Sequence, residues 1–210
     1  MDSILYIVLT ILVVLLSITV HEAMHAYAGY FLGDDTAKAH GRLSFNPIKH
    51  IDPFLTIILP LMLALAGLPI FGGAKPVPFN PNNIRYGEWG AAIVAVAGPL
   101  INFVVAFVAF GIWVVLSPST GSILNIIFGQ IISINLAFFV FNLIPIPPLD
   151  GSRVLYALAP DFARRAMEFI EQSGVVIVFI IIALAGPNVG VFMQSAISFF
   201  YTLFSHIFGV

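Results

Sequence analysis

The chain has 210 residues, of which 60% are apolar and 9% are charged, whereas soluble domains have about 45–50% apolar and about 25% charged residues. This composition excludes a soluble globular protein. Eight basic and ten acidic side chains, with a formal charge of -2, provide no basic surface, so nucleic-acid binding is excluded as a function. The absence of cysteine excludes disulfide bonds, thiolate metal ligands and cysteine nucleophiles.

Three long segments without Asp, Glu, Lys or Arg indicate a chain that crosses a lipid bilayer several times; they are residues 53–74, 89–149 and 172–210. A hydrocarbon core about 30 Å thick requires about 20 apolar residues per helix. We therefore predict an all-α polytopic membrane protein with five to six transmembrane helices. Residues 1–210 are predicted to form one integral-membrane domain, with a motif-bearing core at about 1–158 and additional C-terminal helices at about 163–208.

The first predicted transmembrane helix covers residues 4–31, and His21, Glu22 and His25 interrupt its apolar sequence near the C-terminal end. The following segment, residues 36–46, alternates apolar and polar residues with a period of two. This alternation predicts a short strand or a membrane-associated β-hairpin.

The segment from Phe54 to Phe71 is predominantly apolar but contains Pro60 and Pro69, which disfavour a straight continuous helix. It either spans the membrane or re-enters on the same side. If it re-enters, all eight Lys and Arg residues lie on one side of the membrane, whereas a full crossing splits them three against five. The positive-inside rule favours the re-entrant segment and five crossings, with the N-terminus outside and the basic loops in the cytoplasm.

Proline and glycine divide the rest of the chain into helices. A stiff extended connector is predicted at residues 72–81, a kink at Gly98-Pro99, and a break between the last two helices at residues 186–188. The helices themselves are predicted at residues 90–116, 123–144, 163–185 and 189–208.

The sequence His21-Glu22-Ala23-Met24-His25 places two histidines four residues apart, on one helix face where both imidazoles can reach one metal ion. Glu22 lies beside them, as does the carboxylate that accepts a proton in hydrolytic zinc sites. Ionisable residues inside a membrane helix cost at least about a few kcal/mol each, so this group indicates function rather than an incidental polar patch.

A catalytic zinc ion takes three protein ligands and keeps one open position, so one more nitrogen or oxygen ligand is needed. The candidates by residue type are His40, His50, His206, Asp52 and Asp150. Asp150 is favoured, because the proline-rich run from Asn142 to Gly151 leaves backbone carbonyls that require a polar cavity inside the membrane. The alternatives for Asp150 are a helix N-cap or an ion pair with Arg153.

These motifs resemble those of the site-2 proteases, a family of intramembrane zinc metalloproteases. The His21–His25 motif is similar to the first family motif, and the run from Asn142 to Gly151 is similar to the second. Further segments similar to the family are Gly41–Pro47, Ala74–Pro78 and Ala97–Asn102. The resemblance covers about residues 18–155 and indicates a short form without the PDZ or CBS domains of many relatives.

The resemblance implies one Zn²⁺ per chain, bound by His21, His25 and Asp150, with Glu22 as the general base. It also implies that Asn142 orients the substrate or stabilises the oxyanion. From the residues alone, Asn142 is equally well explained by a hydrogen bond to a neighbouring helix. Asn102, in the family-like segment Ala97–Asn102, we interpret as a structural residue that satisfies backbone groups near the Gly98-Pro99 kink.

The predicted function is an intramembrane zinc metalloendopeptidase that cleaves in or near transmembrane segments of membrane-protein substrates, near the cytoplasmic side of the plasma membrane. We expect the edge of the predicted strand at residues 37–45 either to bind the substrate as an added strand or to plug the cavity mouth. The alternative functions are a divalent-metal transporter or a metal-binding membrane scaffold. Histidine and carboxylate ligands also accept divalent metals other than zinc.

Overall fold

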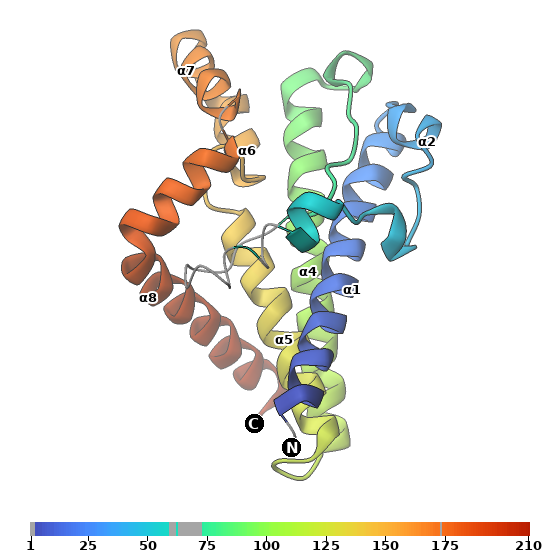
Figure 1. Cartoon of the computed structure of the whole chain (residues 1–210), viewed down its shortest axis with the longest axis vertical. Helices are drawn as coiled ribbons and strands as arrows, with labels where there is room; N and C mark the ends of the chain where they lie inside the picture. The colour runs from blue at the N-terminus through green and yellow to red at the C-terminus, as the bar shows by residue number, and fades with distance from the viewer. Residues whose placement is uncertain (1–2, 59–61, 63–72, 173) are drawn as a thin grey trace.

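The computed structural model describes residues 3–58, 62, 73–172 and 174–210, and within these ranges its regular elements are all helices (Figure 1). They are α1 (Ser3–Phe31), α2 (Thr36–Ala39), η1 (Pro47–Lys49), η2 (Pro53–Ile58), η3 (Pro81–Asn83), α4 (Gly87–Leu116), α5 (Ile123–Asn142), α6 (Gly151–Leu158), α7 (Asp161–Gln172) and α8 (Gly174–Phe208). In the described part of the chain, four segments are long and apolar enough to cross a membrane; they lie in α1, α4, α5 and the C-terminal part of α8. The predicted all-α membrane protein is confirmed, whereas a fifth or sixth crossing is not found among the described residues.

Small residues let α1 and α4 pack closely. Ala23 and Ala26 of α1 are almost completely buried, as are Ala91, Ala92 and Ala95 of α4. Lipid tails provide no hydrophobic drive between helices, so association depends on close van der Waals contact, which small side chains allow. Helix α4 also packs against α5 and α6 and is therefore the central helix of the bundle. This arrangement places the middle of α4 against the polar end of α1.

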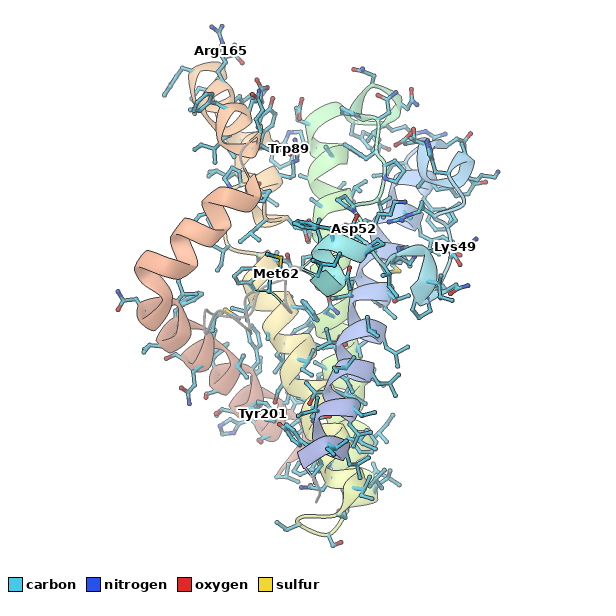
Figure 2. All side chains as sticks on the ribbon, in the orientation of Figure 1. Lys49, Asp52, Met62, Trp89, Arg165 and Tyr201 are labelled. Atoms are coloured by element: carbon cyan, nitrogen blue, oxygen red, sulfur yellow. The ribbon has the colours of Figure 1, made fainter. Side chains whose placement is uncertain are left out.

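Charged residues gather at one end of the bundle. All eight Lys and Arg residues lie either between α1 and α4 or between α5 and α8. Because these four helices alternate in direction, both connections lie at the end opposite the chain termini (Figure 1). Figure 2 shows Arg165 at the outer end of α7, far from the termini. The described bundle thus has the one-sided basic charge expected from a re-entrant segment, but both termini lie at the same end, whereas five crossings would place them at opposite ends (Figure 1).

The segment predicted to re-enter, residues 54–71, lies mostly outside the described residues. The described residues at the two ends of this segment lie together, since the N–H of Gly73 donates to the carbonyl of Leu55 at 3.0 Å and the hydroxyl of Thr56 donates to the carbonyl of Gly73 at 2.7 Å.

A backbone hydrogen bond joins the end of α1 to the start of α4, since the N–H of Arg85 donates to the carbonyl of Leu32 at 2.9 Å. Helix α4 therefore begins at the end of the bundle at which α1 ends, and the two helices are antiparallel.

The strand or hairpin predicted at residues 36–46 is not confirmed. Residues 36–39 form helix α2, and the rest of the segment consists of turns and extended residues without strand pairing. Asp34 explains the helical turn, because its carboxylate accepts hydrogen bonds from the N–H and the hydroxyl of Thr36. The alternating pattern is also not a pattern of burial, since Arg42, expected on the polar side, is 5% exposed.

The C-terminal helices break earlier than predicted. The sequence predicts helices at residues 163–185 and 189–208, but α7 ends at Gln172 and α8 runs without interruption from Gly174 to Phe208. The charged residues of α7 cannot enter the hydrocarbon core, so the chain changes direction before the apolar sequence begins. Pro187 lies inside α8, and Figure 1 shows that this helix is bent, as expected where proline removes a backbone hydrogen bond.

An aromatic core joins α4, α5 and α8 at the end of the bundle near the termini. Phe204 of α8 is 0% exposed, and its ring centroid lies 5.1–5.6 Å from those of Phe103, Phe107 and Phe110 of α4. Edge-to-face aromatic pairs of this kind stabilise a core beyond the area that they bury. This cluster holds α8 against the bundle.

Replacing Phe204 by alanine should lower the free energy of unfolding by about 2 kcal/mol. Phe→Ala changes in soluble cores cost about 3–5 kcal/mol, and the cost is smaller here because lipid is as apolar as the protein interior, so only packing is lost. Unfolding with a denaturing detergent in mixed micelles measures the effect. Phe199→Ala is the matched control, because Phe199 lies on the same helix and is 63% exposed; equal losses in both variants would contradict the role assigned to the cluster.

Candidate metal centre

Three residues from two distant parts of the chain meet beside α4. His21 and His25 lie one turn apart on α1, and Asp150 precedes α6 at the end of the proline-rich run. The Oδ2 atom of Asp150 lies 3.1 Å from Nε2 of His21 and 3.4 Å from Nε2 of His25, and the two Nε2 atoms are 3.0 Å apart. One ligand atom from each residue lies within 4.8 Å of the others. The structure thus brings together the three predicted metal ligands.

The chemistry of these atoms fits a bound cation. The Nδ1 atom of His25 lies 2.8 Å from the carbonyl oxygen of Val94, which can only accept a hydrogen bond, so Nδ1 carries the proton and Nε2 presents a lone pair to the site. The Oδ2 atom of Asp150 is buried and has no hydrogen-bond partner among the described residues, despite the nearby imidazoles. Lone pairs that face one another without a proton repel unless a cation lies between them. Two nitrogen ligands and one oxygen ligand match a zinc site with an open position.

The metal cluster forms part of the wall of a cavity of about 720 Å³. Glu22 and Asn142 also line this cavity. Most of the remaining wall is apolar and comes from α4, α5 and the connector at residues 73–79. This volume is within the usual range of about 300–1,000 Å³ for small-molecule sites. The cavity therefore has room for part of a polypeptide segment beside the three ligands.

Asn142 ends α5 and hydrogen-bonds within its own helix. Its amide nitrogen donates to the carbonyl of Phe138 at 3.0 Å. The alternative that we derived from the sequence, a hydrogen bond to a neighbouring helix, is not found among the described residues. Asn142 therefore lies where its amide could reach a substrate in the cavity, and this role stays a prediction.

The other ligand candidates lie outside the cluster; they are His40, His50, His206 and Asp52. Asp52 instead caps η2, since its carboxylate accepts the N–H groups of Phe54 and Leu55 at 2.9 Å each. The alternatives for Asp150 are also not observed. Its side chain makes no capping hydrogen bond at α6, and Arg153 is paired with Glu171 of α7.

Two buried charged residues hold the connector along the cavity. The guanidinium of Arg42 donates to the carbonyls of Lys49, Lys75 and Pro76. Burial lowers the pKa of Arg42, although the negative charge of Glu22 acts to raise it. Burial acts to raise the pKa of Asp34, but hydrogen bonds from the Asn80 backbone and from its other partners outweigh it, so the pKa lies below its ordinary value.

Gly98 and Asn102 of α4 lie against the two histidines. The sequence did not reveal these contacts. A Cβ atom at Gly98 would lie 2.5 Å from Cε1 of His25 and 2.8 Å from Nε2 of His21. The Oδ1 atom of Asn102 lies 2.6 Å from Nδ1 of His21. Asn102, interpreted from the sequence as a structural residue that satisfies backbone groups near the kink, does bond a backbone carbonyl, that of Ser17 in α1, but it also bonds the His21 ring. A polar side chain within a charge-free membrane helix was the available signal.

Comparison with known proteins places the chain in a family. Residues 118–186 match the model of peptidase family M50. The chain is 40% identical over 185 residues to a Bacillus subtilis protein named "Putative zinc metalloprotease YwhC", a match that covers 84% of this chain and 79% of the relative. Rip2 of Mycolicibacterium smegmatis, which bears the same description, is 30% identical over 179 residues, covering 83% of this chain and 66% of the relative. No solved structure matches the chain significantly. The similarity to YwhC over most of both chains, together with the family match, shows that the chain belongs to peptidase family M50, the site-2 proteases, and is a zinc metalloprotease.

Proposed function

We propose that this metalloprotease is an intramembrane endopeptidase that hydrolyses peptide bonds in or near transmembrane segments of membrane proteins. In this proposal one zinc ion per chain is bound by His21, His25 and Asp150. The observation that carries the proposal is the convergence of these ligands on a cavity that is walled by the membrane-spanning helices α1, α4 and α5. A protease with its ligands at this position acts on substrates that enter between helices.

Hydrolysis requires a base, an acid and a stabilised oxyanion. When bound, zinc acts as a Lewis acid and lowers the pKa of water towards neutrality. The Glu22 carboxylate, next to His21 and in the same cavity, takes a proton from the attacking water and delivers it to the departing amine nitrogen as the C–N bond breaks. One N–H of the Asn142 amide is bonded to Phe138, and the other donates to the substrate carbonyl oxygen as negative charge develops on it.

The substrate must be extended at the cleaved bond, because a helix hides each carbonyl in a hydrogen bond. The connector at residues 73–80 contains no helix or turn, and most of its residues line the cavity. The backbone N–H groups of Val77 and Phe79 have no hydrogen-bond partner among the described residues. We assign the pairing with an extended substrate to this connector, in place of the strand expected at residues 37–45.

The proposed location is the plasma membrane, with the site near its cytoplasmic side. The metal cluster lies towards the end of the bundle that carries all eight Lys and Arg residues. By the positive-inside rule, loops rich in Lys and Arg lie on the cytoplasmic side, which supports this orientation. Membership in a family of metalloproteases disfavours the alternatives of a metal transporter or a scaffold.

The decisive experiment compares the zinc content of the detergent-purified wild type with that of Glu22→Gln and Asp150→Ala. We expect about one zinc ion per chain in the wild type and in Glu22→Gln, and a sharp loss in Asp150→Ala, because only the latter removes a ligand. Elemental analysis of the purified protein measures this. Cleavage of a transmembrane peptide should fall by about 10²–10⁴-fold in Glu22→Gln, since the base is removed while the metal remains.

Either of two results would reject the proposal. Equal zinc content in all three proteins would remove Asp150 from the metal site. Full peptide cleavage by Glu22→Gln would remove Glu22 from the reaction.

A further inference from the structure

A buried group of polar side chains lies behind His21, on the side away from the cavity. Ser17 comes from α1, Asn102 from α4 and Asn135 from α5. Asn102 is 0% exposed and Asn135 is 1% exposed. The proposed reaction uses none of these three residues, yet polar groups at this depth in a membrane protein are costly unless fully hydrogen-bonded.

The hydrogen bonds of this group fix the orientation of each amide in turn. The side chain of Asn135 lies 2.8 Å from the carbonyl of Ile131, and a carbonyl can only accept, so the atom facing it is the amide nitrogen. The oxygen of Asn135 therefore points to Asn102, whose amide nitrogen donates to it at 2.8 Å. The same nitrogen lies 3.3 Å from the backbone carbonyl of Ser17, which allows only this orientation.

The last bond in the series reaches the metal ligand. With its nitrogen committed, Asn102 presents its oxygen to Nδ1 of His21 at 2.6 Å. An oxygen with no hydrogen requires a donor, so the proton of the neutral His21 ring must be on Nδ1. The lone pair is then on Nε2, the atom that faces Asp150 and His25.

We infer that Asn135 and Asn102, with Ser17, form a hydrogen-bond relay that selects the tautomer of His21 and fixes the plane of its ring for metal binding. This inference rests on the metal site of the proposed function. The three residues are positioning residues, because they act on the metal only through His21. Hydrogen bonds to the second nitrogen of a metal-binding histidine commonly change metal affinity by about 10–100-fold.

The relay also couples the site to the packing of three membrane helices. It starts at the backbone of α5, passes through α4 and ends on α1. A second bond ties α5 to α1 directly, since the amide of Asn135 donates to the hydroxyl of Ser17 at 2.9 Å. Each oxygen atom named in these bonds accepts a hydrogen bond. Removing one of the three side chains therefore leaves a buried polar group without its partner.

The test measures zinc affinity by competition with a chromogenic chelator in Asn102→Leu and Asn135→Leu. We expect the zinc affinity to fall by about 10–100-fold in Asn102→Leu. In Asn135→Leu it should fall by about 10-fold, because Asn102 remains but its side-chain amide is free to rotate. The matched control is Gln130→Leu. Gln130 is a buried amide on the same helix, and it bonds Thr10 of α1 at 2.7 Å without reaching His21. Wild-type affinity in the control and reduced affinity in both relay variants would support the relay; equal affinity in all three variants would overturn it.

A second measurement does not depend on zinc. The ¹⁵N signals of the His21 ring report which nitrogen carries the proton when the ring is neutral. They are best compared in an Asp150→Ala background, which removes the carboxylate that competes for a proton on Nε2. The proton should reside on Nδ1 in this background and move at least partly to Nε2 when Asn102→Leu is added.

The two measurements separate the relay from the site that it serves. Unchanged His21 signals after Asn102→Leu would reject the relay and leave the proposed function intact. A wild-type protein that binds no zinc would reject the proposed site, while the ¹⁵N comparison would still decide whether Asn102 sets the His21 tautomer.

Discussion

Gly98→Ala is expected to empty the metal site, although it adds only one methyl group to a helix. The added Cβ would lie 2.5 Å from Cε1 of His25 and 2.8 Å from Nε2 of His21, distances at which the imidazoles must move. Each ring is hydrogen-bonded through Nδ1, His25 to the carbonyl of Val94 and His21 to the side-chain amide of Asn102. Neither ring can therefore move away without breaking a hydrogen bond. Displacement of about 1 Å at a reacting centre costs about 10²-fold in rate. We therefore expect loss of zinc and a fall in peptide cleavage of about 100-fold or more.

The comparison for this variant is Gly129→Ala in α5. No atom lies within 4 Å of a Cβ built at Gly129, so alanine is accommodated there and should improve the helix slightly. Zinc content and thermal unfolding are measured for both proteins. If Gly98→Ala retained wild-type zinc content, the close approach of α4 to the two imidazoles would be wrong.

Gly151→Ala should detach the third ligand. A Cβ at Gly151 would lie 2.5 Å from the carbonyl carbon of Leu143 and 2.9 Å from the carbonyl oxygen of Ile144. Both neighbours are backbone atoms, which cannot turn aside as a flexible side chain can. The start of α6 must therefore move, and Asp150 moves with it. We expect zinc content to fall nearly as far as in Asp150→Ala, again with about 100-fold or more loss of cleavage.

Leu155→Ala provides the control on the same helix. Leu155 is 44% exposed, so its truncation changes α6 without pressing on the backbone of residues 143–144. Elemental analysis and cleavage of the same transmembrane peptide give the comparison. Full zinc content in Gly151→Ala would show that Asp150 does not depend on the contact between α6 and the end of α5.

Local periodicity was sufficient to predict α1, α4 and α5 and the placement of His21 and His25 on one helix face, but not the break between α7 and α8. A helix places residues four apart on the same face, so the relation between His21 and His25 follows from their spacing alone. Asp150 required more, because its position depends on how the chain returns after α5. The proline-rich run and the resemblance pointed to it, and the structure places it 3.1 Å from His21.

Contacts between distant residues explain what the sequence did not reveal. Asn102 is 81 positions from His21, and nothing in the spacing of either residue indicates that they touch. Gly98 was interpreted as part of a kink, but in the structure its lack of a Cβ atom leaves room for the two imidazoles. The strand predicted at residues 36–46 failed because Asp34 and Arg42 bond to Asn80 and Lys75, far along the chain, which an alternating pattern cannot show.

The two imidazoles differ in how readily mutation can disturb them. The proton of His25 is held by the main-chain carbonyl of Val94 at 2.8 Å, and every amino acid carries that group. Position 94 can therefore accept any side chain that preserves α4 and its packing, and the hydrogen bond persists. The partner of His21 is a side chain, so one base change at the codon of Asn102 can abolish it. Mutational robustness at the proposed metal centre is consequently unequal, because the orientation of His25 depends on the helix backbone and that of His21 depends on one particular amide.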